Sequence, residues 1–283
     1  MEQIIIRNQT FDEERALYGI QNAVVEDCTF AGPADGESVL KETRRITVRS
    51  CSFSLRYPFW HVAGCEAERC TLDELTRAPI WYARDFAMKD SEVRGVKCLR
   101  ECENSTFTGC KVISPEFGWK CRGVKLTDCE MEGEYFLFES SDVEVERLQM
   151  KGKYSFQYMK NLHIIDSVLD TKDAFWHSEN VVVENSVVKG EYLGWFSRGL
   201  TLINCRIIGT QPLCYCEDLK LTGCTMEGTD LSFEYSDVEA DITGHIDSVK
   251  NPKSGHIVAD SIGEVIWEGS VMDTRGEVRV REK

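Results

Sequence analysis

The chain has 283 residues, of which 42% are hydrophobic and 29% are charged, and its formal net charge is −15. A surface this acidic repels phosphate backbones, so these numbers argue against nucleic acid as a partner. They also disfavour anionic membranes and strongly acidic polymers, unless the surface carries a local basic strip. No run of 18 apolar residues occurs, and the first residues lack the apolar stretch of a signal peptide, so the sequence predicts neither a membrane segment nor secretion.

The chain contains 13 cysteines. Without a secretion signal, this number favours a reducing compartment, and we expect a cytoplasmic protein. Their spacing does not match zinc-binding patterns, so the sequence predicts no metal site and no cofactor. Most of them recur at one position of an internal repeat, where we expect small buried apolar side chains.

The repeat is clearest in the segment Val124–Met131, which alternates apolar and polar residues and has a small polar pair in its middle. Cognate segments begin every 19 residues, at Val143, Leu162, Val181, Leu200 and Leu219. The alternation predicts a strand and the polar pair predicts a bend. The bend position is occupied, turn after turn, by residues that tolerate unusual backbone angles: Asp27, Ser50, Asp90, Gly109, Asp128, Asp166, Asn185, Asn204 and Gly223.

This periodicity predicts an all-β fold, a single-stranded right-handed parallel β-helix (β-solenoid) of about eleven turns. We expect one domain, with an N-terminal cap at 1–20, repeats at 21–245, and a C-terminal cap and tail at 246–283. A leucine-rich repeat is the main alternative, but its period is usually roughly 20–29 residues and the second half of this unit has no helical pattern. A left-handed helix would show a six-residue period, which is absent.

The two ends of the repeat array suggest capping structures, because open strand edges invite aggregation. Thr10–Glu13 resembles a capping box that would open a short helix through Leu17, although an irregular lead-in is the alternative. Ile257–Ala259 and Glu264–Trp267 are expected to be strands, arranged as a terminal hairpin.

The second half of the repeat carries aromatic residues interleaved with charges of both signs. Such a face suits a carbohydrate, because rings can stack on sugar faces while charged groups bind hydroxyls. The candidate substrate-binding residues are Lys97, Arg100, Glu116, Trp119, Tyr135, Tyr154, Tyr158, Asp173, Trp176 and Tyr192. Stacking between neighbouring turns for stability alone would produce the same pattern.

Four residues of this face are candidates for catalysis. Glu101 and Glu139 lie two turns apart, about 9.6 Å by strand spacing, at the upper edge of the separation that an inverting glycosidase needs. Lys120 lies between them and is a candidate base for β-elimination. His177 follows Trp176 and is a candidate acid or base, and it lies six turns from His61, too far for a shared site.

Several strings, including Arg56-Tyr57-Pro58-Phe59-Trp60-His61, Ser114-Pro115-Glu116-Phe117-Gly118-Trp119 and Asp173-Ala174-Phe175-Trp176-His177, resemble a bacterial family of unknown function, family 3737. The resemblance covers essentially the whole chain. It implies a pectin-lyase-like β-helix fold and assigns no catalytic residue, and fold analogy to polysaccharide-processing helices is a weak guide to function.

Two functions therefore remain open. The aromatic and charged face could bind, and as a glycoside hydrolase or polysaccharide lyase cleave, an oligosaccharide or polysaccharide. Alternatively, the same face could make the chain a non-enzymatic scaffold that binds a protein or a second copy of itself. The repeat is least regular before residue 91, so we expect any non-repetitive site in the N-terminal turns.

Overall fold

The computed structural model describes residues 3–32 and 37–282, and within those ranges it contains strands and turns but no helix. The strands belong to two compact units, Met1–Glu144 and Val145–Lys283. Each unit is a parallel β-solenoid, which confirms the predicted fold class, and together they contain about 14 turns rather than eleven.

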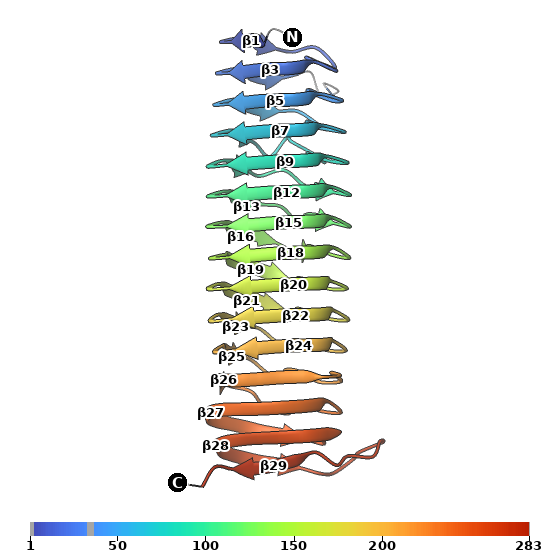
Figure 1. Cartoon of the computed structure of the whole chain (residues 1–283), viewed down its shortest axis with the longest axis vertical. Coiled ribbons are helices and arrows are strands. Elements are labelled where there is room, and N and C mark those ends of the chain that lie inside the picture. Colours follow the sequence, from blue (N-terminus) through green and yellow to red (C-terminus); the bar gives the residue numbers. More distant parts are fainter. Residues whose placement is uncertain (1–2, 33–36, 283) are drawn as a thin grey trace. The chain divides into compact units, whose positions relative to one another are not determined.

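In the first unit, successive turns contribute strands that pair in parallel in two long sheets (Figure 1). The first sheet contains β1 (Ile4–Arg7), β3 (Gln21–Glu26), β5 (Arg44–Arg49), β7 (Ala63–Glu68), β9 (Arg84–Lys89), β12 (Glu103–Thr108) and β15 (Arg122–Thr127). The second contains β2 (Thr10–Phe11), β4 (Thr29–Ala31), β6 (Ser52–Ser54), β8 (Thr71–Leu72), β10 (Glu92–Val93), β13 (Lys111–Ile113) and β16 (Glu130–Gly133). A short third sheet consists of β11 (Cys98–Arg100), β14 (Glu116–Trp119) and β17 (Tyr135–Phe136).

The second unit repeats this arrangement with longer strands near its C-terminal end. Its first sheet contains β20 (Lys160–Ile165), β22 (Glu179–Glu184), β24 (Arg198–Ile203), β26 (Leu219–Glu227), β27 (Asp237–Lys250), β28 (Ser254–Ile266) and β29 (Glu277–Val280). Its second contains β19 (Gln149–Lys153), β21 (Val168–Lys172), β23 (Val187–Lys189) and β25 (Arg206–Ile208), which pairs with the end of β26. The remaining strand, β18 (Ser141–Glu146), extends over the boundary of the two units.

The core of each unit consists of columns of inward side chains, one from every turn. Leu162, Val181 and Leu200 occupy one register position on three successive strands, and all three are buried. Phe30 and Phe53 stack with ring centroids 4.9 Å apart. Because neighbouring strands lie about 4.8 Å apart, a side chain always meets its own cognate. Apolar alternation in the sequence therefore becomes continuous apolar columns.

The predicted bends are confirmed. All nine predicted bend residues have φ between 47° and 64°, in the left-handed region that Asn, Asp and Gly adopt most readily. Asn204 donates its side-chain amide to the Asn185 side chain at 3.3 Å, which extends the stacking into the turns. At residue 109 a glycine is also required sterically, because a Cβ atom there would lie 2.5 Å from the Asp90 carboxylate.

The cysteines are buried free thiols, as predicted. The repeat position accepts either Cys or Ser because both make the same contacts. Cys110 donates to the Thr108 carbonyl, and Ser186 donates to the Glu184 carbonyl, two residues back in each case. Both residue types also accept the amide of the residue stacked one turn before, as Ser91 does from Cys70.

Of the two alternatives for the N-terminal segment, the irregular lead-in is the one observed. Residues 14–19 form hydrogen-bonded turns and no helix, and Thr10 and Phe11 already pair in parallel with Thr29 and Phe30. The expected hairpin is the single strand β28, which runs parallel to β27 along its whole length. The terminal tail adds β29 to the same sheet. The segments expected to be caps therefore form further turns of the solenoid, which explains why there are about 14 and not eleven.

Burial also predicts how the thiols react. It raises the pKa of Cys51 to about 12 and that of Cys216 to about 11. The pKa of Cys129 and of Cys205 is instead lowered, by hydrogen bonds with the Cys110 and Cys224 thiols, but these thiols are buried from reagent like the others. We therefore expect none of the 13 cysteines to react within minutes with Ellman's reagent at pH 8, and all 13 to react in denaturant. Rapid labelling of one or more thiols in the native protein would contradict this packing.

Candidate functional site

Two rows of side chains point outward along the start of the first sheet in each unit. In every turn, an outward residue is followed by a buried one and then by a second outward residue, which begins the strand. We call these the first outer row and the second outer row. In the first unit the first row contains Glu42, His61, Tyr82, Glu101, Lys120 and Glu139, and the second contains Arg44, Ala63, Arg84, Glu103, Arg122 and Ser141.

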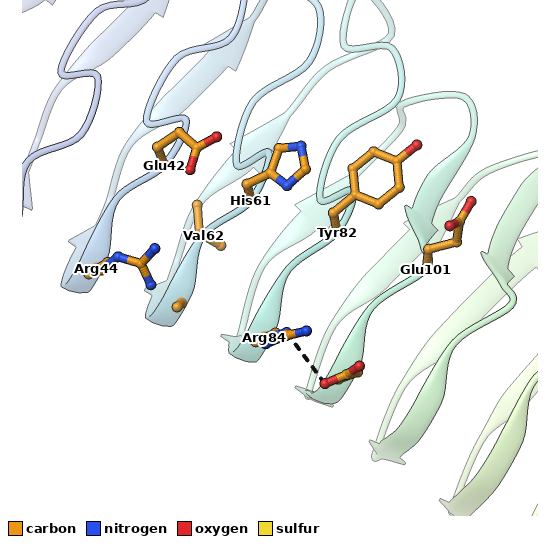
Figure 2. A pocket seen from close by; sticks show the side chains of 9 residues that line it. Glu42, Arg44, His61, Val62, Tyr82, Arg84 and Glu101 are labelled. Carbon is orange, nitrogen blue, oxygen red and sulfur yellow. Dashed lines mark ion pairs between the residues drawn. The ribbon is translucent and has the colours of Figure 1, made fainter.

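A hollow of about 310 Å³ lies along four turns of these rows. Figure 2 shows His61 and Tyr82 side by side, with Glu42 and Glu101 beyond them in the same row, and Arg44 and Arg84 in the second row. We call this hollow the N-terminal groove. Its lining comprises Glu42, Arg44, His61, Val62, Ala63, Tyr82, Arg84, Glu101 and Glu103.

The groove exists because Ala63 interrupts a row of long charged side chains. Ala63 pairs in register with Arg44 on one side and with Arg84 on the other. Those two arginines therefore lie two turns apart, about 10 Å by strand spacing, with only a methyl group between them. A long side chain at residue 63 would fill this space.

The charges of the groove are incompletely paired. Arg84 lies 3.4 Å from Glu103, and both side chains are exposed, so this pair contributes little to stability. Arg44, Glu42 and Glu101 make no ion pair with any residue of the ranges that the structure describes. A cation and two carboxylates are thus available at the surface.

His61 and Tyr82 form the aromatic part of the groove. Their rings stack with centroids 4.8 Å apart and 16° between planes. The stacking restricts the rotation of both rings. The imidazole nitrogens of His61 and the hydroxyl group of Tyr82 are the polar groups that they bring to the groove. The outer faces of this two-ring stack point along the row, toward Glu42 on one side and Glu101 on the other (Figure 2).

The equivalent rows of the second unit provide an internal comparison. Their second outer row reads Lys160, Glu179, Arg198 and Glu217, with no small residue. Lys160 lies 3.5 Å from Glu179, and Arg198 lies 2.9 Å from Glu217. The same repeat positions are therefore filled and paired in the second unit, whereas in the N-terminal groove they are hollow and partly unpaired.

Of the predicted site residues, only Glu101 lines the groove. Its predicted partner Glu139 lies 3.6 Å from Lys120 in an exposed ion pair outside the groove. Glu42 and Glu101 are three turns apart, about 14 Å by strand spacing, which is too far for the acid and base of a glycosidase. Glu42 and Glu101 therefore do not form a hydrolytic pair.

Arg100 is held between two tryptophans. Its guanidinium carbon lies 4.7 Å from the Trp81 ring centroid and 4.8 Å from that of Trp119. Glu116 lies 3.4 Å from Arg100 and 3.8 Å from Lys97. Tyr135 packs edge-on against Trp119, with centroids 5.9 Å apart. These five predicted ligand-binding residues thus contact one another, and their role in binding stays a prediction.

The predicted residues of the second unit also contact their neighbours. Trp176 stacks on Trp195 at 5.5 Å and donates its indole N–H to the Tyr192 carbonyl at 2.6 Å. His177 lies between Tyr158 and Phe196, 5.0 Å from each. Tyr154 packs under Lys153, 5.2 Å from its ammonium. Asp173 is buried, and that burial raises the pKa of its carboxyl despite the nearby Lys172.

Sequence reasoning missed most of the groove. Of the residues that line it, sequence reasoning selected only Glu101, although it expected any non-repetitive site in the N-terminal turns. The available signal was Ala63, a small residue at a repeat position that is otherwise mostly charged. No group of three or more His, Cys, Asp or Glu side chains in the described ranges could hold a metal ion.

The repeat, the parallel sheets and the stacked columns define this chain as a β-solenoid protein. It belongs to the family described as protein of unknown function DUF3737, whose model matches residues 4–279. No curated protein matches the sequence. No helix in the described ranges is long and apolar enough to cross a membrane.

Three solved structures of low sequence identity resemble this chain, and the first supports the fold alone. The surface adhesin PfbA of Streptococcus pneumoniae matches with a TM-score of 0.56 and 8% identity, over 81% of this chain and 83% of that one. The A-module of the Azotobacter vinelandii mannuronan C-5 epimerase AlgE6 matches with a TM-score of 0.38 and 10% identity, over 97% and 87%. A GH87 alpha-1,3-glucanase catalytic domain matches with a TM-score of 0.32 and 8% identity, over 99% and 64%.

The position of Arg100 leads to a prediction about stability. Arg100→Met keeps the aliphatic packing but removes two cation–π contacts and the ion pair with Glu116, so we expect a loss of about 1–2 kcal/mol in the free energy of unfolding. Lys120→Met, one turn away, removes only an exposed ion pair and should cause no measurable loss. Denaturant unfolding followed by tryptophan fluorescence measures both. Equal effects of the two substitutions would contradict a structural role for Arg100.

Proposed function

We propose that the chain binds a short carbohydrate in the N-terminal groove, and that the bound sugar carries an acidic group. The observation that carries this proposal is the hollow at Ala63, with the unpaired Arg44 beside it and the unpaired Glu42 and Glu101 along its first row. At the same repeat positions of the second unit, long side chains fill the corresponding space and form ion pairs with one another.

The lining supports a polar ligand rather than an apolar one. Most ligand pockets are lined by apolar side chains with a few polar groups, whereas seven of the nine side chains here are charged or polar, among them Glu42, Arg44, His61 and Tyr82. The volume of about 310 Å³ is at the lower end for ligand pockets, so it suits one end of a chain or a small sugar.

Each group has a plausible partner on an acidic sugar. The Arg44 guanidinium can form two parallel hydrogen bonds with a carboxylate. Glu42 and Glu101 can accept hydrogen bonds from sugar hydroxyl groups, and the His61 imidazole and the Tyr82 hydroxyl can hydrogen-bond with further hydroxyl groups. Glu42 and Glu101 lie too far apart to act together as acid and base, so the proposal is limited to binding.

Filling the hollow should abolish binding. Ala63→Gln places a long neutral side chain between Arg44 and Arg84, so we expect affinity for acidic tri- and tetrasaccharides to fall at least about tenfold, because the ligand loses its volume. Ala87→Gln is the matched control, since Ala87 lies in the next strand, β9, between Glu66 and Thr106 in register, and does not line the groove. Isothermal titration calorimetry with a panel of neutral and acidic oligosaccharides measures both.

Binding of no sugar in the panel, or equal binding by Ala63→Gln and wild type, would overturn the proposal. Product analysis after incubation separates a binder from an enzyme, because cleavage would shorten the oligosaccharide.

Arg44 should determine the preference for an acidic sugar. We expect Arg44→Gln to weaken acidic oligosaccharides about tenfold while leaving neutral ones of the same length unchanged, since a charge-assisted hydrogen bond is lost. Arg77→Gln, at an exposed arginine outside the groove, is the control. An equal loss for neutral and acidic sugars would show that Arg44 shapes the groove without reading the charge.

A further inference from the structure

The second unit carries an exposed strip that consists of its two outer rows over four turns. The aromatic row contains Tyr158, His177, Phe196 and Tyr215. The charged row contains Lys160, Glu179, Arg198 and Glu217, which occupy one register position on successive turns. We call these eight residues the C-terminal strip.

The aromatic row is a continuous stack. Successive ring centroids are 5.0, 5.0 and 4.8 Å apart, and the angles between planes do not exceed 18°. Tyr158 is 47% exposed and Phe196 is 43% exposed, although both stack on His177. Because the rings cover each other's faces, the strip presents ring edges outward. Ring edges do not offer the flat surface on which a sugar stacks, so the row favours a protein surface as its partner.

The charged row alternates strictly in sign. Lys160 and Arg198 are cations, and Glu179 and Glu217 are carboxylates, so the row is neutral within a chain of net charge −15. Two copies of so acidic a chain repel each other over most of their surface. The neutral strip avoids that repulsion.

A row with this alternation is complementary to itself when its direction is reversed. Consider a two-fold axis that lies in the interface, perpendicular to the stacking direction, between the turns of Glu179 and Arg198. It places Lys160 of one copy opposite Glu217 of the other, and Glu179 opposite Arg198. The same operation places the aromatic row against itself, with Phe196 opposite His177. An interface between identical chains around a two-fold axis requires this kind of self-complementary patch.

We propose that the C-terminal strip is a dimerisation surface, on which two copies of the chain associate around this two-fold axis. From first to last turn the strip spans about 14 Å by strand spacing. This length places it among small interfaces, so the dimer forms reversibly and depends on protein concentration. The proposal does not depend on ligand binding in the N-terminal groove.

Charge reversal tests the proposal. Sedimentation velocity of the full chain, from low micromolar to several hundred micromolar, should show a sedimentation coefficient that rises toward that of a dimer. Arg198→Glu and Glu179→Arg each place like charges opposite one another, so each alone should weaken self-association at least roughly tenfold. An equimolar mixture of the two variants restores every opposite pair across the axis, and it should dimerise as wild type does.

The control for Arg198→Glu is Arg206→Glu, which makes the same change in net charge outside the strip. Arg206 is an exposed arginine on β25 that pairs with Glu227. The Arg206→Glu variant should dimerise like wild type, and circular dichroism should show that all variants are folded. A wild-type chain that stays monomeric at every concentration, an Arg198→Glu variant that dimerises normally, or a mixture that fails to recover association would overturn the proposal.

Discussion

Every feature of this protein depends on in-register stacking of one turn on the next. Backbone hydrogen bonds fix neighbouring strands about 4.8 Å apart, so each side chain lies directly beside its cognate in the adjacent turns. Side chains at inward positions form apolar columns. Residues at the bends, which have left-handed φ, stack on one another, and side chains at outward positions form rows in which each contacts its neighbour in the next turn. A single turn could not bury its inner face, and the stack supplies what each turn lacks.

The same constraint makes an outward row stabilising by default. Rings stack on rings, and carboxylates pair with ammonium or guanidinium groups of the next turn, so most of the aromatic and charged residues contact one another. Arg100 between Trp81 and Trp119 is the clearest case. The abundance of such residues is therefore a poor indicator of a ligand site, whereas a break in their row is a better one.

The two proposed surfaces differ in how the row is completed. In the N-terminal groove, Ala63 leaves a space and Arg44 stays unpaired, so the surface is complementary to a small ligand. In the C-terminal strip, every charge of the second row has a neighbour of opposite sign, so the row is neutral and complementary to its own reverse. The two proposals thus rest on differences at a few positions of one repeat pattern.

The sequence by itself determined the fold class, the bends and the burial of the cysteines, because a 19-residue period and strict alternation survive in the one-dimensional pattern. It did not determine the ends, where a strand of 13 residues such as β28 has no repeat to reveal it. The tertiary structure alone decided the orientation of the second half of each turn. Lys97, Leu99 and Glu101 all have left-handed φ, so the chain bends repeatedly there and residues four apart need not share a face. It also decided where the groove lies, since an alanine becomes a cavity only when long side chains stack on both sides of it.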